Sequence, residues 1–308
     1  MSSEAPDAGL NIHDTVSLEA MSAPPLETPA GEDSARLADL VGGRRVVALT
    51  GAGMSTDSGI PDYRGPDSPP RTPMTFQQFM GDAAFRRHYW ARNHLGWRHM
   101  DASRPNAGHR ALAGLERAGV VCGVLTQNVD LLHTKAGSRR VIDLHGSYAQ
   151  VRCMGCEALI SRFTLAQRLD AANPGFAESV SAATGVEIAP DADAVIEETA
   201  HFVMVNCEHC GGILKPDIVY FGESVPKPRV EAAFAMVAEC ELLLVLGSSL
   251  TVMSGLRFVR RAAKDGTPVV IVNRGPTRGD EFATLKLDAG CSEVLTALDD
   301  QKVSGFQT

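Results

Sequence analysis

Four of the seven cysteines stand in two Cys-x-x-Cys pairs, a spacing with which proteins bind metal ions through thiolates. The pairs are Cys153 with Cys156 and Cys207 with Cys210. Four thiolates complete the tetrahedral coordination of a structural Zn²⁺ ion and leave no open position for chemistry. We therefore expect one zinc ion with a role in folding. Disulfides and a redox pair are the alternatives, and His209, inside the second pair, could compete as a ligand.

Amide and carboxylate side chains gather in the segment Thr126-Gln127-Asn128-Val129-Asp130, directly after an apolar run at 120–125 that predicts a buried strand. Such a segment lies at the carboxyl end of a parallel sheet, where open α/β folds bind ligands. Its side chains suit a ribose and a carboxamide, although loop and helix-cap hydrogen bonds are an alternative interpretation.

A histidine occupies the comparable place after a second short strand. His145 follows the predicted strand at 141–144 and precedes the first cysteine pair, so it stands at a domain junction, where a ligand cleft is expected. His133 is the other candidate histidine, and its place in the sequence favours a structural role.

Glycines follow a third apolar run, at 46–49. The absence of side chains in Gly51-Ala52-Gly53 lets the backbone approach a phosphate, and helix-compatible residues come next. Thr56 replaces the usual third glycine, so the pattern also fits an ordinary tight turn and argues against a dehydrogenase. A plain dinucleotide-binding turn does not need the second polar cluster, at 59–64, which ends in Asp62-Tyr63-Arg64.

Composition limits the possible classes of protein. The chain has 308 residues, of which 44% are hydrophobic, which suits a soluble protein with one large core and a second module. No apolar run approaches the ~20 residues of a membrane helix. Residues 1–33 carry seven of the net eight negative charges and no Lys or Arg, so the remainder is nearly neutral and a nucleic-acid partner is not expected. We interpret 1–33 as a disordered acidic tail without a targeting signal, and expect a cytoplasmic protein.

Alternating strands and helices predict an α/β fold, a doubly wound parallel Rossmann-type sheet with a smaller zinc-ribbon and helical domain. Further strands are expected at 218–221, 242–246, 268–272 and 285–287, and helices at 34–40, 76–100, 106–118, 230–238 and 255–263. We assign 34–75, 106–147 and 214–300 to the nucleotide-binding domain, 76–105 and 148–213 to the small domain with an insert at about 171–206, and 301–308 to a tail.

Together these segments resemble the sirtuins, the NAD-dependent protein deacylases. Their signature Gly-Ala-Gly-x-Ser stands at 51–55, and Ser-Gly-Ile-Pro-Asp-Phe-Arg stands at 58–64, with Tyr63 in place of Phe. Thr-Gln-Asn-x-Asp and His-Gly follow at 126–130 and 145–146. The resemblance spans about 34–297, and Tyr63 and the long zinc insert depart from the commonest pattern.

The resemblance implies roles for four residues. Gln127 would contact the nicotinamide ribose, Asn128 would line the reacting pocket, Asp130 would bind the carboxamide, and His145 would be the general base. In the implied reaction the acyl-lysine oxygen attacks C1′ of the ribose and expels nicotinamide. His145 then takes a proton from a ribose hydroxyl, and lysine and O-acyl-ADP-ribose result. An unperturbed histidine, with a pKa of about 6.5, suits that transfer.

The resemblance also implies the remaining contacts. NAD would be held by Gly51, Ala52, Gly53, Ser55, Asp62, Tyr63, Arg64, Gln127, Asn128, Val129, Asp130, His145, Gly247, Ser248, Ser249, Asn273, Arg274, Gly275 and Cys291. The segment 215–223 would pair with a substrate peptide as an added strand, through Val219, Phe221, Gly222 and Glu223. The expected partners are acylated lysines of other proteins, with neither nucleic acid nor membrane, and we expect a monomer.

The acyl group is a separate question. Several segments, including the insert, resemble the class II branch, which contains the mitochondrial sirtuin of animals and is linked to longer or acidic acyl groups. Tyr89 and Arg92 share a helix face and could hold an acyl carboxylate, or they could be a core tyrosine and a surface arginine. A mono-ADP-ribosyltransferase and an NAD-sensing binding module are the alternative functions.

Overall fold

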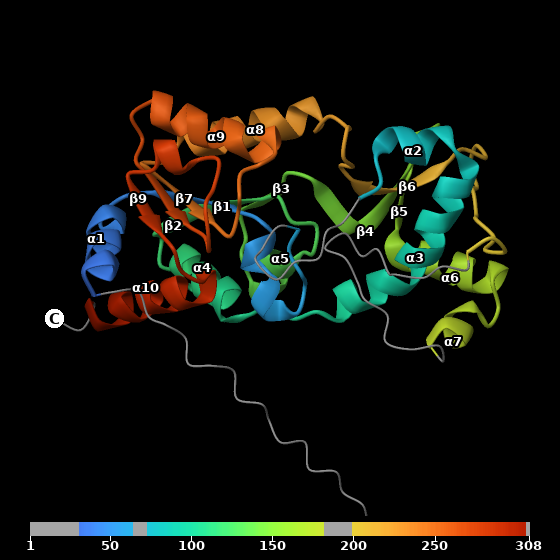
Figure 1. Ribbon diagram of the computed structural model, residues 1–308, viewed down its shortest axis with the longest axis horizontal. Helices are drawn as coiled ribbons and strands as arrows, with labels where there is room; N and C mark the ends of the chain where they lie inside the picture. Colours follow the sequence, from blue (N-terminus) through green and yellow to red (C-terminus); the bar gives the residue numbers. More distant parts are fainter. Residues whose placement is uncertain (1–30, 64–72, 182–198, 306–308) are drawn as a thin grey trace, which may run out of the picture.

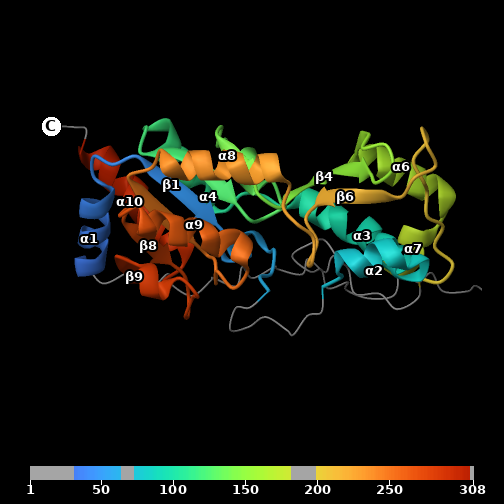
Figure 2. The same ribbon diagram turned by 90° about the horizontal axis from the view of Figure 1, so that it is seen from above.

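The computed structural model describes residues 31–63, 73–181 and 199–305. Some sequence-based expectations lie outside these ranges, namely those for the tail at 1–30, for Arg64, for 182–198 of the insert and for 306–308. Two lobes lie side by side along the longest axis, the larger built on a parallel sheet and the smaller on an antiparallel sheet (Figures 1 and 2). Within the described ranges, none of the helices combines the length and the apolar content that a membrane span requires.

The parallel sheet of the large lobe has the doubly wound strand order. Its strands are β1 (Val46–Thr50), β2 (Val121–Thr126), β3 (Val141–Asp143), β7 (Leu242–Leu246), β8 (Val269–Val272) and β9 (Leu285–Leu287). They lie in the order β3-β2-β1-β7-β8-β9, and each neighbouring pair is parallel. The direction of winding reverses between β1 and β7, which is where such sheets bind ligands. The predicted fold class is confirmed.

Helices cover both faces of this sheet (Figure 1). One face carries α1 (Gly31–Val41), α4 (Ala107–Arg117) and α10 (Cys291–Gly305), and the other carries α8 (Lys227–Ala238) and α9 (Met253–Lys264). A hydrophobic core lies on each face of the sheet. Alternate residues of β1 pack into the two cores, because side chains along a strand point to opposite faces. Val46 and Ala48 pack into the first core, and Val47 and Leu49 into the second.

The small lobe combines helices with a three-stranded antiparallel sheet. In the sheet, β4 (Gly146–Cys153) lies between β5 (Leu159–Ser161) and β6 (Leu214–Ile218). The helices of the lobe are α2 (Phe76–Gly81), α3 (Ala83–Ala102), α6 (Arg162–Ala172) and α7 (Phe176–Ser181). A short helix, α5 (Leu132–Ala136), and the 3₁₀ turns η1 (Ala52–Met54), η2 (Thr56–Ser58) and η3 (Asp280–Phe282) complete the described elements.

Three sequence-based expectations are corrected. The strand expected at 218–221 is not part of the parallel sheet: β6 ends at Ile218 and pairs with β4. The helix expected at 76–100 is broken at Asp82, whose carboxylate accepts hydrogen bonds from the N–H groups of Ala84 and Phe85 and so starts a new helix. The helix expected after Gly53 consists of only the two 3₁₀ turns, and Gly59, with φ of +79°, ends the second.

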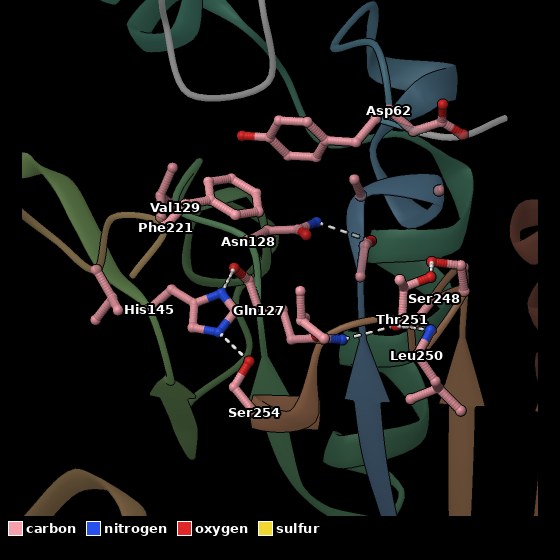
Figure 3. Close-up of a pocket in the computed structure, with 18 of the residues that line it drawn as sticks. Asp62, Gln127, Asn128, Val129, His145, Phe221, Ser248, Leu250, Thr251 and Ser254 are labelled. Atoms are coloured by element: carbon pink, nitrogen blue, oxygen red, sulfur yellow. Dashed lines mark hydrogen bonds between the residues drawn. The ribbon is translucent and has the colours of Figure 1, made fainter. Parts of the chain in front are cut away.

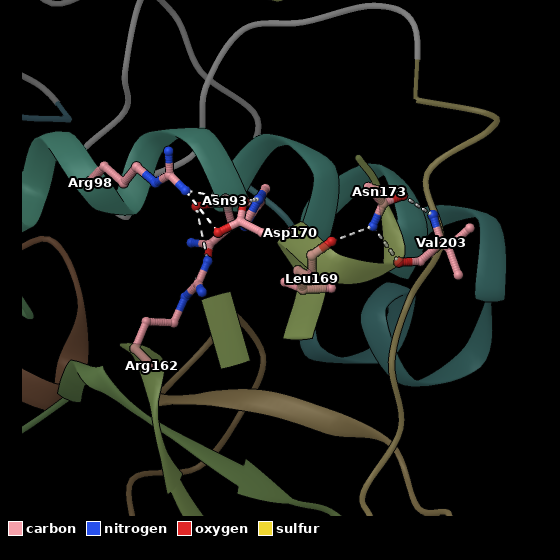
Figure 4. Close-up of polar contacts among 8 residues, drawn as sticks. Asn93, Arg98, Arg162, Leu169, Asp170, Asn173 and Val203 are labelled. Carbon is pink, nitrogen blue, oxygen red and sulfur yellow. Dashed lines mark hydrogen bonds and ion pairs between the residues drawn. The ribbon is translucent and has the colours of Figure 1, made fainter. Parts of the chain in front are cut away.

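A buried arginine at the start of α6 joins that helix to α3 (Figure 4). Arg162, which is only 2% exposed, donates to the side-chain oxygen and to the backbone oxygen of Asn93 on α3. Its guanidinium also lies 5.5 Å and 4.8 Å from the ring centres of Trp90 and Trp97. Hydrogen bonds and cation–π contacts therefore compensate part of the cost of burying this charge.

Candidate active site

A cavity of about 870 Å³ lies at the carboxyl ends of the parallel strands, on the side that faces the small lobe (Figure 3). The register of the strands explains why the site residues meet there. Thr50 is opposite Thr126 in β2 on one side and opposite Leu246 in β7 on the other. The residues that follow these three strands therefore leave the sheet at the same level, which brings together segments that are far apart in the sequence.

Glycines let the ends of β1 and β7 pack backbone against backbone. An added Cβ atom on Gly51 would lie 2.7 Å from the oxygen of Gly247, and one on Gly53 would lie 3.0 Å from the Cα atom of Gly247. Gly247 itself has a φ of +59°, and an added Cβ would lie 2.4 Å from the nitrogen of Met54. Side chains are excluded here, so backbone groups line the cavity, as the binding of a phosphate requires.

Side chains from the β2 end form a hydrogen-bonded network with the β1 loop. Asn128 donates to the backbone oxygen of Gly51 and to the hydroxyl oxygen of Ser55, each at 3.0 Å. Ser55 in turn donates to the Asp130 carboxylate at 2.7 Å. Burial raises the pKa of Asp130, and this hydrogen bond and the one from the N–H of Leu132 oppose the increase. The network holds four predicted NAD contacts, including Gly51, in fixed positions.

Gln127 connects the β2 end to the β7 end. Its amide donates to the hydroxyl oxygen of Ser248 at 2.8 Å (Figure 3). Most of the other predicted contacts also line the cavity: Ala52, Asp62, Tyr63, Val129, Ser249, Asn273, Arg274 and Gly275. Cys291 does not line it. This residue is buried at the start of α10, and its expected contact with NAD stays a prediction.

His145 has both ring nitrogens engaged (Figure 3). Nδ1 is 2.8 Å from the backbone oxygen of Gln127, which can only accept, so Nδ1 carries the proton. Nε2 is 2.8 Å from the hydroxyl oxygen of Ser254. Burial, first of all, lowers the pKa of His145 to about 4, and the charges of Arg229 and Arg257 contribute to the decrease. The ring is therefore neutral at pH 7, and its free electron pair is on Nε2.

The segment that follows β6 forms the wall of the cavity beside His145. Val219 donates from its backbone to the oxygen of His145 at 2.8 Å, and Phe221 packs edge-on against Tyr63 with 6.0 Å between the ring centres. Val219, Phe221, Gly222 and Glu223 all line the cavity. The predicted peptide segment thus lies next to the predicted base.

Tyr89 and Arg92 lie elsewhere. Tyr89 is only 1% exposed and packs among the aromatic rings of the small lobe, and its hydroxyl accepts a hydrogen bond from Asn93. A guanidinium nitrogen of Arg92 lies 3.0 Å from Nε2 of His88. Neither residue lines the cavity. The geometry therefore gives no support to the prediction that this pair binds an acyl carboxylate.

Two cavity residues at the start of α9, Ser254 and Arg257, were missed by the sequence analysis. The sequence predicted a helix from Gly255, which makes Ser254 an apparent N-cap. In the structure Val252 is the N-cap, and the hydroxyl of Ser254 contacts His145 instead. One sequence feature could have identified Ser254 as a site residue: it is a serine at the start of a helix, in a segment that follows a strand of the parallel sheet.

The four cysteines of the two pairs meet in the small lobe. Their Sγ atoms all lie within 4.8 Å of one another, with 3.4 Å between Cys153 and Cys210 and 3.8 Å between Cys156 and Cys207. Tetrahedral thiolates at about 2.3 Å from zinc are separated by about 3.8 Å. Gly212 packs against them, since an added Cβ would lie 2.9 Å from Sγ of Cys153. The cluster fits one structural zinc ion, and His209 is not part of it.

The cavity fits NAD in size and in chemistry. Its volume lies in the range of ligand sites, and it joins a glycine-rich backbone surface to amide, hydroxyl and carboxylate groups. A dinucleotide site next to a neutral histidine, with a separate four-cysteine cluster in the small lobe, is the arrangement expected of an NAD-dependent enzyme.

Comparison with known proteins identifies the family. The model of the Sir2 family matches residues 51–254, and the chain belongs to this family. NAD-dependent protein deacetylase 1 of Mycobacterium avium (strain 104) is 65% identical over 269 residues, which cover 87% of this chain and 95% of that protein. The protein of the same name from Streptomyces coelicolor is 50% identical over 275 residues, which cover 89% and 91%.

Solved structures agree with this result. A structure of Sir2 with a p53 peptide and NAD⁺ has a TM-score of 0.69 and 30% identity, and the match covers 87% of this chain and 98% of that one. A second Sir2 structure, concerned with the mechanism and regulation of these enzymes, has a TM-score of 0.70 and 28% identity, with coverage of 89% and 99%. The resemblance inferred from the sequence motifs is confirmed for the family, and the class II branch stays a prediction.

Proposed function

We propose that the chain is an NAD-dependent protein-lysine deacylase. The observation that carries the proposal is the position of His145, which lies between the glycine-rich NAD surface and the segment 219–223 that is expected to bind peptide. The relatives named NAD-dependent protein deacetylases support it, since they cover most of the chain. A binding module or sensor needs no base at this place, which disfavours that alternative.

Each group has a task in the proposed reaction. Bound NAD would supply an electrophilic C1′ and nicotinamide as the leaving group. The fixed amides of Gln127 and Asn128 orient the ribose and exclude water, which favours attack by the acyl oxygen. His145 is neutral and accepts a ribose hydroxyl proton at Nε2, because Nδ1 already carries a proton.

The preference for acidic or longer acyl groups is a finer proposal. It is supported by the sequence resemblance to the class II branch alone, because the cavity must hold NAD as well as the acyl group and its volume does not distinguish between acyl groups. It does not rest on Tyr89 and Arg92. If Arg92→Ala lowers glutaryl-peptide activity relative to acetyl-peptide activity, those residues have a role that the geometry does not reveal.

The first experiment is incubation of the pure protein with NAD and a panel of acylated lysine peptides, with His145→Ala alongside. Mass spectrometry follows nicotinamide, O-acyl-ADP-ribose and free-lysine peptide. Equal amounts of the three products are expected from the parent, neither O-acyl-ADP-ribose nor free-lysine peptide is expected from the variant, and the panel ranks the acyl groups. ADP-ribose attached to protein without deacylated peptide would support the ADP-ribosyltransferase alternative instead, and NAD binding without turnover would support the sensor.

A further inference from the structure

The base of the proposed reaction forms a hydrogen bond with another side chain of the same protein. Nε2 is the nitrogen of His145 that can accept a proton, and the hydroxyl of Ser254 lies 2.8 Å from it (Figure 3). Because Nδ1 donates to the oxygen of Gln127, the Ser254 hydroxyl must be the donor in the bond to Nε2. The electron pair that the reaction needs is therefore directed at Ser254.

Ser254 is held firmly in this position. It is the second residue of α9, a 12-residue helix whose first turn packs against the β2 end. Gly255 shows how close that packing is, because an added Cβ atom would lie 2.6 Å from Oε1 of Gln127. The helix start cannot move toward Gln127, and Gln127 supplies the other contact of the His145 ring. One rigid unit thus positions both ring nitrogens.

The hydroxyl of Ser254 also reaches the ligand space. Ser254 and His145 both line the cavity, together with Arg257 one helical turn further along α9. A hydroxyl can donate one proton while it accepts another, which alanine cannot do. The arrangement is thus a base, a hydroxyl in contact with its free electron pair, and a cavity in which that hydroxyl can meet a ligand hydroxyl.

We propose that Ser254 is a positioning residue for the general base and the route by which the proton reaches it, an inference that rests on the proposed deacylase function. A ribose hydroxyl gives its proton to Oγ of Ser254, while the original proton of Ser254 moves to Nε2. The products are an imidazolium, an unchanged serine and a ribose oxyanion. As the oxyanion forms its bond to the acyl carbon, the π electron pair between that carbon and the lysine nitrogen moves to the nitrogen. No oxidant or reductant is involved.

The proposal separates the two stages of the reaction. Expulsion of nicotinamide does not need the base, whereas transfer of the acyl group does. Exchange of labelled nicotinamide into NAD, in the presence of acyl peptide, measures the first stage, and release of deacylated peptide measures the whole reaction. We expect Ser254→Ala to lower peptide release at least ~10-fold and to leave exchange within about twofold of the parent. Ser254→Thr, which keeps the hydroxyl, should recover most of the rate.

Ser147→Ala is the matched control. Ser147 lies on β4 two residues after His145, but its hydroxyl accepts a hydrogen bond from the N–H of Ala149 and does not contact the ring. A ¹⁵N NMR measurement of the His145 ring adds a readout that is independent of turnover. The Nε2 resonance should move in Ser254→Ala, because the hydrogen bond to its electron pair is lost, and should stay in place in Ser147→Ala.

Equal losses of exchange and of peptide release in Ser254→Ala would overturn the proposal, because the serine would then only shape the NAD site. Unchanged peptide release, an unmoved Nε2 resonance or failure of Ser254→Thr to recover the rate would also overturn it. If the parent protein neither exchanges nicotinamide nor releases peptide, the deacylase function itself is wrong. His145→Ala, which should keep exchange and lose peptide release, distinguishes these cases.

Discussion

Burial changes the protonation of His145 more than any of its hydrogen bonds does. It lowers the pKa of the ring to about 4, whereas the bond from Nδ1–H to Gln127 favours the charged form. The sequence analysis assumed a histidine near pKa 6.5, and the structure corrects that value. The ring is a weaker base than expected, but it is in the accepting form over the whole physiological range.

A prediction for the pH dependence follows. A neutral imidazole accepts the proton, so lowering the pH from 8 to 6 should leave kcat/KM for deacylation constant. Activity should be lost only as the pH approaches 4, where the His145 ring takes up a proton. Initial rates at limiting peptide and saturating NAD test this. An acid limb centred near pH 6.5 would contradict it.

At the scale of the elements, the junction between β1 and β7 depends on Gly247. Its φ of +59° and the 2.4 Å contact that an added Cβ would make with the nitrogen of Met54 exclude a side chain. Gly247→Ala should therefore destabilise the fold by about 2–4 kcal/mol and abolish NAD binding. Thermal unfolding and calorimetric titration with NAD measure the two effects.

Gly266→Ala is the control for this substitution. Gly266 also has a positive φ, +75°, but an added Cβ would meet nothing within 4 Å. Its replacement should cost only the backbone strain, about 1 kcal/mol, with NAD binding retained. Equal effects of the two substitutions would show that close packing at the strand ends is not what the glycine provides.

The cysteine cluster yields a second prediction at this scale. Cys156→Ser removes one of four ligands, so zinc content should fall from one ion per chain to near zero, and the melting temperature should fall with it. Cys122→Ser, on β2 of the parallel sheet and outside the cluster, should keep the ion. Elemental analysis of the purified proteins measures this, and stoichiometric zinc in Cys156→Ser would refute a four-cysteine site.

At the scale of the whole molecule, buried histidines make the fold sensitive to acid. His133 lies in the core of the large lobe, where burial lowers its pKa to about 4, and its ring centre is 4.8 Å from that of His109, whose pKa burial lowers to about 2. Between pH 6 and pH 4 the unfolded chain binds protons at these positions and the folded chain does not. The free energy of unfolding therefore decreases as the pH is lowered from 6 to 4. Asp143, whose pKa burial raises to about 6, opposes part of the effect.

A substitution isolates the contribution of one histidine. Gln in place of His133 does not titrate, so the free energy of unfolding of His133→Gln should fall less steeply between pH 6 and pH 4, by about 1 kcal/mol per pH unit. The amide of Gln also reaches the position of Nε2, the atom through which His133 contacts the hydroxyl of Thr50 at 2.8 Å. Urea unfolding at several pH values measures the slope, and an unchanged slope would show that His133 is not involved.

The parts of the molecule that could be predicted from the sequence share one property. Strands β1, β2, β7 and β8 are continuous apolar runs because both faces of the parallel sheet are covered, and the residues just after them line the cavity. The strand expected at 218–221 shares only Ile218 with β6, because Lys215-Pro216 interrupts the apolar pattern of the actual strand.

The contacts of the base could not be predicted in the same way. The hydrogen bond from Ser254 to His145 joins positions 109 residues apart, and no local pattern records such a pair. The low pKa of His145 depends first on the burial of the ring, which a sequence pattern does not contain. The burial of Tyr89 has the same origin, because aromatic rings from α2 and from the segment after β6 enclose it.

The order of the strands along the chain has a consequence for synthesis on the ribosome. The antiparallel sheet and its four cysteines are complete within residues 146–218, whereas β1, finished at Thr50, pairs with β7, which begins at Leu242. A nascent chain can thus close the metal module before the parallel sheet has its central pair. Until β7 emerges, one edge of β1 offers unpaired backbone groups to other strands. We expect self-association of nascent chains to be greatest in this interval and to end once residue 246 has left the exit tunnel.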